Sequence, residues 1–270
     1  MLVVKIGGAK GIAEHIAALA ADIAACARDG ARVVVAHGGS AEADELGHRL
    51  GVPPRRITSP SGHVSRYTDQ ATLEVVIMAM AGAVNTALVR ALQNCGLPAV
   101  GLSGVDGGLL RGTRKEAIRS VEGAKVKLVR DDFSASISSV NTALLGLLLD
   151  AGYVPVVCPL VLAQGGEACN VDADRAAAAI ARAMGADALI LLSNVPGLLR
   201  DAGSPGTLLR HITLDLADRY EAVAAGRMKT KYQAAVEAAR SGVARAIIAD
   251  ARRDRPVSSA LAGQGTVISA

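Results

Sequence analysis

Aromatic residues are nearly absent from this chain of 270 residues, which has no Trp, one Phe and four Tyr. Proteins that bind single-stranded nucleic acid without sequence preference stack the bases on aromatic side chains. The formal net charge is only +4, so strong attraction to nucleic acid is not implied either, although a modest basic surface still attracts an acidic partner. We therefore expect no nucleic-acid partner.

Cysteine is scarce as well, with four residues scattered along the sequence. No pair has the spacing of metal ligands and the pattern does not form a disulfide framework, which is typical of reduced thiols in a cytosolic protein. The sequence shows no basic-plus-apolar leader and no long uninterrupted apolar run that would indicate a membrane span. We expect a cytoplasmic protein without a membrane partner.

Small aliphatic residues are abundant instead: 51% of the chain is hydrophobic and 29 residues are Gly. The length suffices for one large α/β domain or for two lobes around a shared sheet. The pattern predicts helices packed on a parallel sheet. Helices are expected over 12–29, 41–50, 68–93, 138–150, 174–184, 214–224 and 230–240. Strands are expected over 2–6, 32–36, 99–102, 153–158, 188–192, 244–249 and 266–268.

Two predicted strands end in a Gly-Gly pair, Gly7-Gly8 and Gly38-Gly39. In an open α/β sheet, ligands bind beyond the carboxyl ends of the strands, and glycines there let backbone N–H groups approach an anion at a helix N-terminus. Ordinary tight turns explain one such pair equally well. Two pairs together with Lys5 favour a phosphoryl site, whereas His37 is expected to serve packing or hydrogen bonding.

Several polar stretches have two interpretations each. Residues 51–68 are rich in Pro, Gly and Ser and form a loop or short hairpin, in which Arg66 is either a clamp for a carboxylate or a solvated surface residue. The basic stretch 111–130 is expected to contain a hairpin, which a solvated surface also explains. Asp172 and Asp174, at the start of a helix, either cap it or face the ligand.

Together these stretches resemble the amino acid kinase family, specifically its acetylglutamate kinase branch, over the whole chain. The matching stretches, in order, are Lys5-Ile6-Gly7-Gly8, His37-Gly38-Gly39-Ser40, Arg66, 170–174, 192–197 and 226–231. The resemblance implies a three-layer αβα sandwich with a mostly parallel sheet. It also implies an N-terminal lobe, 1–165, for the acyl substrate and a C-terminal lobe, 166–270, for ATP.

The resemblance implies a role for each matching residue. Lys5 and Lys231 flank the transferred phosphoryl group, and Asp174 orients both lysines. The four glycines Gly7, Gly8, Gly38 and Gly39 bind phosphoryl oxygens, and Gly38, Gly39, Arg66 and Asn170 hold the substrate. The nucleotide is assigned to Ser193, Asn194, Gly197 and Lys229. Mg²⁺ is expected to bridge the ATP phosphates with few protein ligands, so no residue is assigned to a metal.

Three departures from ordinary acetylglutamate kinases lie at Asn194, at Arg227 and in the stretch 59–69. All three resemble the branch that phosphorylates aminoadipate or glutamate carried on the small acidic carrier protein LysW. Carrier binding is assigned to Arg119, Lys125 and Lys127 of the basic stretch. A kinase for free acetylglutamate and a non-catalytic nucleotide or amino-acid sensor remain the alternatives. Relatives of this type imply a homodimer.

Overall fold

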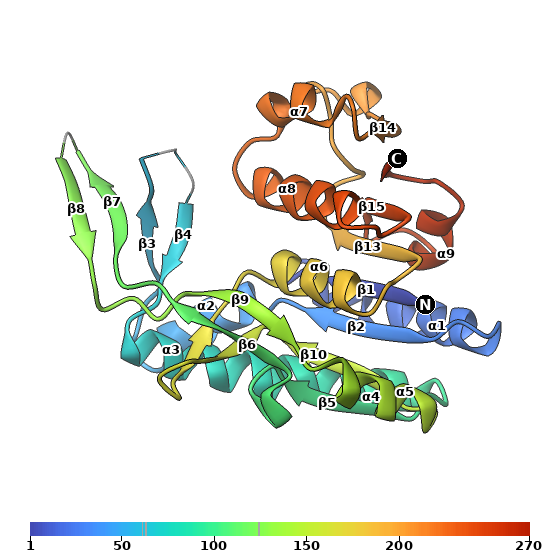
Figure 1. The fold of residues 1–270 in the computed structure, drawn as a ribbon, viewed down its shortest axis with the longest axis horizontal. Helices are drawn as coiled ribbons and strands as arrows, with labels where there is room; N and C mark the ends of the chain where they lie inside the picture. The colour runs from blue at the N-terminus through green and yellow to red at the C-terminus, as the bar shows by residue number, and fades with distance from the viewer. Residues whose placement is uncertain (61, 63, 124) are drawn as a thin grey trace.

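An eight-stranded sheet forms the centre of the computed structural model, which describes residues 1–60, 62, 64–123 and 125–270 (Figure 1). Neighbouring strands are parallel except for β15 and β16, which are antiparallel. The mostly parallel sheet implied by the resemblance is thereby confirmed. The strands, in spatial order, are β14 (His211–Thr213), β16 (Thr266–Ser269), β15 (Arg245–Asp250), β13 (Ala188–Ser193), β1 (Leu2–Ile6), β2 (Val33–His37), β10 (Val154–Cys158) and β5 (Ala99–Ser103).

Helices cover both faces of this sheet, which makes the three-layer sandwich. Side chains of one strand alternate between the two cores, so that Val3 and Leu189 pack on one face and Val4 and Ile190 on the other. Because both faces are buried, the strands are continuous apolar runs. One face carries α5 (Thr142–Asp150), α6 (Ala173–Ala183) and α8 (Arg227–Arg240), and the other α1 (Ile16–Arg28), α4 (Asn85–Asn94) and α9 (Pro256–Leu261).

A smaller sheet and two hairpins stand at one side of the central sheet (Figure 1). The smaller sheet has the order β12 (Ala168–Asn170), β11 (Leu160–Ala163), β6 (Leu110–Arg114) and β9 (Ala135–Val140). The hairpins are β3 (Arg55–Thr58) with β4 (Val64–Tyr67), and β7 (Ile118–Glu122) with β8 (Lys125–Val129). Hairpins in both polar stretches are thus confirmed, although Ser61 and His63 of the first lie outside the described residues.

One long, unusually apolar helix corresponds to the helix predicted over 68–93. It joins α3 (Gln70–Ile77), a π-helical segment (Met78–Val84) and α4, and the Asp69 side chain caps it by accepting from the Thr72 N–H. Over Gln70–Asn94 it is long and apolar enough to cross a membrane, with a mean hydropathy of 1.8 in its most apolar window, of which 39% is buried. No other helix of the described residues has this length and composition.

Three local predictions were wrong. Residues 138–140 belong to β9 rather than to a helix, because this run of Ser and Ile residues pairs with β6. The helix α5 begins only at Thr142, and the Asn141 side chain is its N-cap. The predicted helix 214–224 is a single turn, α7 (Ala217–Tyr220), followed by a 3₁₀ turn. The start of the predicted helix 41–50 also favours Ser40 as its N-cap, but Ser40 does not cap α2 (Ser40–Arg49), because its hydroxyl donates to the Gly8 carbonyl, 2.8 Å away.

Strand β1 lies between β2 and β13, at the point where the chain changes from one side of the sheet to the other. Ile6 is paired with His37 on one side and with Leu192 on the other, so the three strands end level. Ligands bind at such a switch point, beyond the carboxyl ends of the strands. The two Gly-Gly pairs and Ser193 are therefore brought to one place.

Candidate active site

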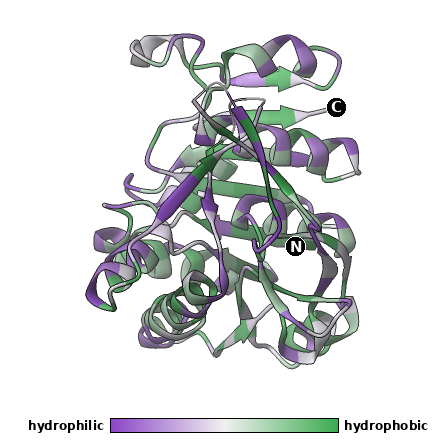
Figure 2. Cartoon of the chain, turned by 90° about the vertical axis from the view of Figure 1, so that its left-hand side faces the viewer, coloured by the Kyte–Doolittle hydropathy of each residue, from purple (hydrophilic) through white to green (hydrophobic). Residues whose placement is uncertain are grey.

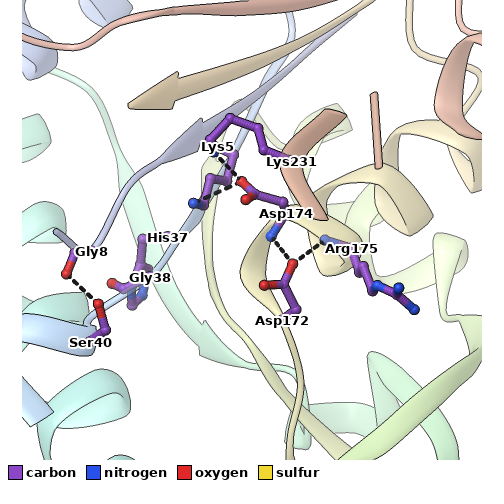
Figure 3. A network of polar contacts seen from close by, with 9 residues as sticks. All are labelled: Lys5, Gly8, His37, Gly38, Ser40, Asp172, Asp174, Arg175 and Lys231. Carbon is purple, nitrogen blue, oxygen red and sulfur yellow. Dashed lines mark hydrogen bonds and ion pairs between the residues drawn. The ribbon is translucent and has the colours of Figure 1, made fainter. Parts of the chain in front are cut away.

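A buried carboxylate lies between two lysines at this end of the sheet. The Nζ atoms of Lys5 and Lys231 each lie 2.8 Å from Oδ1 of Asp174 (Figure 3). Lys5 comes from β1, Asp174 from the first turn of α6 and Lys231 from α8. No side chain of the three is exposed by more than 9%, so their charges act on one another with little screening by water.

The charges of this cluster determine its protonation. Burial opposes ionisation of Asp174, but the positive charges of Lys231 and Lys5 and their hydrogen bonds hold its pKa well below its usual range. Burial lowers the pKa of Lys231 to about 8. The negative charge of Asp174 raises this pKa, and the positive charge of Lys5 lowers it further. The cluster is therefore a carboxylate with two ammonium groups near neutral pH, with a formal surplus of positive charge that suits an anion.

Asp172 and Asp174 have different roles: Asp172 caps the helix and Asp174 faces the cleft. Asp172 caps α6, since its Oδ1 accepts from the N–H groups of Asp174 and Arg175 at 3.0 Å each (Figure 3). This cap starts the helix so that Asp174 faces the lysines. Asp174 itself is the residue that contacts both cations, which a capping role alone does not explain.

The four glycines pack against one another beside this cluster. A Cβ on Gly8 would lie 2.1 Å from the backbone N of Gly39, and one on Gly38 would lie 3.0 Å from the backbone N of Gly8. A Cβ on Gly7 would meet Ile12 Cδ1 at 2.7 Å. None of the four has a positive φ. Close approach of the two turns requires glycine at Gly8 and Gly38, whereas a Cβ on Gly39 would meet the Met80 side chain at 2.9 Å.

A cleft of about 670 Å³ opens in front of the cluster and the glycines. Arg66 and Asn170 line it from the side of the hairpins, and Ser193 and Asn194 line it from the end of β13. The structure thus brings together most of the residues singled out from the sequence. These are Lys5, Gly7, Gly8, Gly38, Gly39, Arg66, Asn170, Asp174, Ser193, Asn194 and Lys231.

Five of the sequence-derived residues lie away from this lining. Gly197 packs on β16, where a Cβ would lie 2.6 Å from Thr266 Oγ1. Lys229 is 40% exposed, with its Nζ 4.0 Å from Glu221 Oε1. Arg119, Lys125 and Lys127 are exposed on the second hairpin, whose base contributes Ile118 to the cleft.

Arg66 is held in place by a residue that sequence reasoning missed. Its guanidinium lies 2.5 Å from Asp44 Oδ1 and donates to the Ser40 carbonyl at 3.1 Å, and its side chain is only 9% exposed. Asp44 comes one helical turn after Ser40 in α2, but no local signal in the sequence pairs it with Arg66, which lies in a hairpin. The ion pair directs Arg66 into the cleft as a fixed cation.

Metal ligands are not gathered at the cleft. Among the residues that the structure describes, no group of three or more His, Cys, Asp or Glu side chains is arranged to hold a metal ion. Asp174 is committed to two lysines. A cation that enters the cleft on the oxygens of a polyphosphate needs few protein ligands. The small number of carboxylates that line the cleft fits this way of binding.

Comparison with known proteins agrees with this geometry. Residues 1–250 match the family model described as "Amino acid kinase family".

The chain belongs to the amino acid kinase family.

Among its relatives is the LysW-aminoadipate kinase of Thermus thermophilus, 48% identical over 99% of this chain and 100% of that protein. The acetylglutamate kinase of Methanopyrus kandleri is 39% identical over 87% of this chain and 90% of that protein.

Proteins of known structure share the fold. N-acetylglutamate synthase from Neisseria gonorrhoeae, solved with coenzyme A and N-acetyl-glutamate, has a TM-score of 0.80 and 28% identity, covering 100% of this chain and 59% of that one.

Proposed function

We propose that this protein transfers the γ-phosphoryl group of ATP to the side-chain carboxylate of aminoadipate or glutamate carried by a LysW-type protein, in the biosynthesis of lysine or arginine. The observation that carries the proposal is the buried Lys5–Asp174–Lys231 cluster at the cleft, in a chain similar over its whole length to a LysW-aminoadipate kinase. The product is an acyl phosphate.

The cluster suits this reaction because phosphoryl transfer depends on positioning and on charge stabilisation. The acceptor carboxylate is already an ionised nucleophile, so no general base is needed. Lys5 and Lys231 stabilise the negative charge on the transferred group, and Asp174 orients them. Backbone N–H groups of Gly7, Gly8 and Gly39 bind its oxygens, whereas the N–H expected from Gly38 donates to the Ile6 carbonyl at 3.0 Å instead. Mg²⁺ carried by the nucleotide would supply further charge neutralisation and would need few protein ligands.

The two substrates are assigned to opposite sides of the cleft. Arg66, from the N-terminal lobe, 1–165, holds the acyl substrate together with Asn170, which lies at the start of the C-terminal lobe, 166–270. The nucleotide lies in the C-terminal lobe, 166–270, against Ser193 and Asn194, with Gly197 and Lys229 next to it. The support is that Arg66, from β4, and Asn194, which follows β13, line the same cleft.

An assay of ATP turnover tests this proposal directly. Carrier-linked aminoadipate, carrier-linked glutamate and free N-acetyl-L-glutamate are supplied separately, and we expect turnover with a carrier-linked substrate. Turnover only with free acetylglutamate would support the second candidate, which the 39% identity to the Methanopyrus kandleri enzyme favours. ATP binding without turnover of any of the three would point to a sensor instead.

Replacing Arg66 by Ala is expected to raise the KM for the acyl substrate far more than the KM for ATP. A buried guanidinium that pairs with a carboxylate contributes about 1.5–3 kcal/mol through its charged hydrogen bonds, which corresponds to a change of about 10- to 100-fold. Arg55→Ala is the control. Arg55 lies in the same hairpin as Arg66, but its side chain is 58% exposed and pairs with Asp69, the N-cap of α3. Equal KM values in the two variants would remove Arg66 from the substrate site.

The pKa of Lys231 makes turnover depend on pH. Its pKa in the folded protein without ligand is about 8, so kcat/KM, which reports the free enzyme, is expected to fall as the pH rises through about 8 and the ammonium group loses its proton. Stability responds with the opposite sign: between that value and the unfolded pKa of about 10.4, the unfolded chain binds more protons, and this group favours folding increasingly as pH rises. A pH profile of kcat/KM that stays flat to pH 10 would contradict the assignment.

The second hairpin is the proposed docking surface for the acidic carrier, and it has two different faces. Cross-strand pairing places Lys125 and Lys127 with Ser120 on one face, and Arg119 with Leu128 on the other. Hydrophilic segments lie beside hydrophobic ones on this side of the molecule (Figure 2). Val126 and Leu128 are 57% and 58% exposed, so the Arg119 face combines a positive charge with apolar surface.

Reversing Arg119, Lys125 and Lys127 to Glu together is expected to raise the apparent KM for carrier-linked substrate and to flatten its dependence on salt. Charges at the rim of an interface mainly accelerate encounter and are screened over about 8 Å at physiological ionic strength. The KM for ATP should not change. Arg119→Glu alone, compared with the Lys125/Lys127 pair, identifies the face used. Unchanged carrier kinetics at every salt concentration would contradict the docking surface.

A homodimer in the cytoplasm completes the proposal. The support is the apolar helix Gln70–Asn94, of which only 39% of the most apolar window is buried within one chain. A second copy of the chain, packed on this helix, would cover the remaining apolar surface. Sedimentation or light scattering, with Met78→Glu as a variant because Met78 is 48% exposed, measures whether the dimer forms there.

A further inference from the structure

His37, the last residue of β2, is buried directly behind the second glycine pair, with 1% of its surface exposed. Its ring has two polar partners. Nδ1 lies 2.9 Å from the carbonyl oxygen of Gly38, and Nε2 lies 3.0 Å from the side-chain nitrogen of Asn85. Figure 3 shows His37 with Gly38 between the Gly8–Ser40 contact and the lysine cluster.

These contacts determine which ring nitrogen carries the proton. Asn85 Nδ2 also donates to the carbonyl of Val156 at 2.9 Å, so this atom is the NH₂ group of the amide. It therefore donates to Nε2 of His37 as well, and Nε2 has no proton. A neutral imidazole has one donor and one acceptor, so Nδ1–H donates to the Gly38 carbonyl. Burial lowers the pKa of His37 to about 4, which keeps the ring neutral.

The bond from Nδ1 fixes the peptide between Gly38 and Gly39. The structure contains no cis peptide bond among the described residues, and in a trans peptide the C=O and the following N–H point in opposite directions. With the Gly38 carbonyl turned to His37, the Gly39 N–H is turned away from the ring. This N–H donates to no group in the described part of the chain, and Gly39 lines the cleft.

A Gly-Gly peptide resists rotation poorly, because glycine occupies regions of φ and ψ that other residues avoid. Rotating this peptide by half a turn would present the carbonyl oxygen of Gly38 where the Gly39 N–H now lies. A partial negative charge would then replace a donor beside the transferred phosphoryl group. Something must therefore hold the peptide in one orientation, and His37 makes the only bond to the Gly38 carbonyl among the described residues.

We propose that His37 is a positioning residue, whose Nδ1–H holds the Gly38 carbonyl so that the Gly39 N–H stays directed at the phosphoryl group, with Asn85 selecting the ring tautomer. This inference rests on the phosphoryl transfer proposed above. His37 contacts neither substrate, and its effect reaches the reaction only through the backbone of Gly38 and Gly39.

A pair of matched variants tests this inference. In His37→Asn the amide nitrogen takes the place of Nδ1 and can still donate to Gly38, whereas His37→Leu has the same shape as Asn without a donor. We expect kcat to fall by about 10- to 100-fold in His37→Leu, which is less than the loss of a whole preorganised donor. The KM for ATP should stay within about twofold. His37→Asn should recover most of the lost kcat.

Two results would overturn the inference. One is equal kcat in the two variants, because a purely structural ring leaves the same cavity in both. The other comes from ¹⁵N NMR of the wild-type protein, which does not depend on how a variant folds: we expect a proton on Nδ1 of His37, and a proton on Nε2 would exclude the bond. Absence of turnover in the wild-type protein with every substrate would instead contradict the proposed function and leave the tautomer measurement valid.

Discussion

Replacing Asp174 by Asn is expected to lower kcat by about 10³-fold in a protein that still folds. The amide keeps the shape of the side chain but removes the charge that holds Lys5 and Lys231 at 2.8 Å from one oxygen atom. Both lysines then lose their fixed positions, and misplacing even one charge-stabilising group costs about 10²–10³-fold. Steady-state kinetics and a thermal unfolding curve of the same sample measure the two effects separately.

Asp172→Asn is the matched control for this variant. Asp172 lies two residues earlier and caps α6 without an ion pair to either lysine, and Asn is as good an N-cap as Asp. Most of the turnover should therefore remain. If instead Asp174→Asn lowers the melting temperature while its folded fraction turns over normally, Asp174 is a structural residue and the mechanism above is wrong.

Replacing either Lys5 or Lys231 by Ala is expected to lower kcat by about 10²–10³-fold while ATP binding weakens much less. Each ammonium group is needed most when negative charge is spread over the transferred phosphoryl group, so its loss affects the transition state more than the ground state. Rapid-quench or steady-state measurements of kcat, together with ATP binding by calorimetry, separate these effects.

Lys10→Ala provides the comparison for the two lysine variants. Lys10 is exposed and follows the first glycine turn, so it shares the neighbourhood of the cleft but not the cluster. Its removal should leave kcat within about twofold, as is usual for surface substitutions. Wild-type turnover in Lys5→Ala or Lys231→Ala would remove that lysine from the mechanism.

The central part of the site could be predicted from the sequence because its signals are local. An apolar β-branched run that ends in Gly-Gly predicts both the strand and its ligand-facing end, and this applies to Gly7-Gly8 and Gly38-Gly39. Residues 138–140 also have a local signal, because they come just before the apolar run of α5 and so favour a helix. In the structure they form the end of β9, which pairs with β6. Pairing with a distant strand overrode the local preference.

Other features depend on contacts between distant parts of the chain. The Arg66–Asp44 ion pair joins a hairpin to a helix, and the His37–Asn85 bond joins residues 48 positions apart. Neither pair has a spacing that points to its partner. The sequence also does not determine which side chains share a face of the second hairpin. Arg119 and Lys127 lie on different faces because of the strand register, which depends on the position of the turn.

The buried cluster also links folding to occupancy of the site. Two ammonium groups share one carboxylate in a place from which water is excluded, so the empty protein confines like charges at a cost to its own stability. A polyphosphate that binds there removes this repulsion only in the folded state. Ligand at 100 times its Kd stabilises a folded protein by about 2.7 kcal/mol. The melting temperature therefore reports the filling of the cleft, and a thermal-shift screen of anions can identify ligands without any assay of turnover.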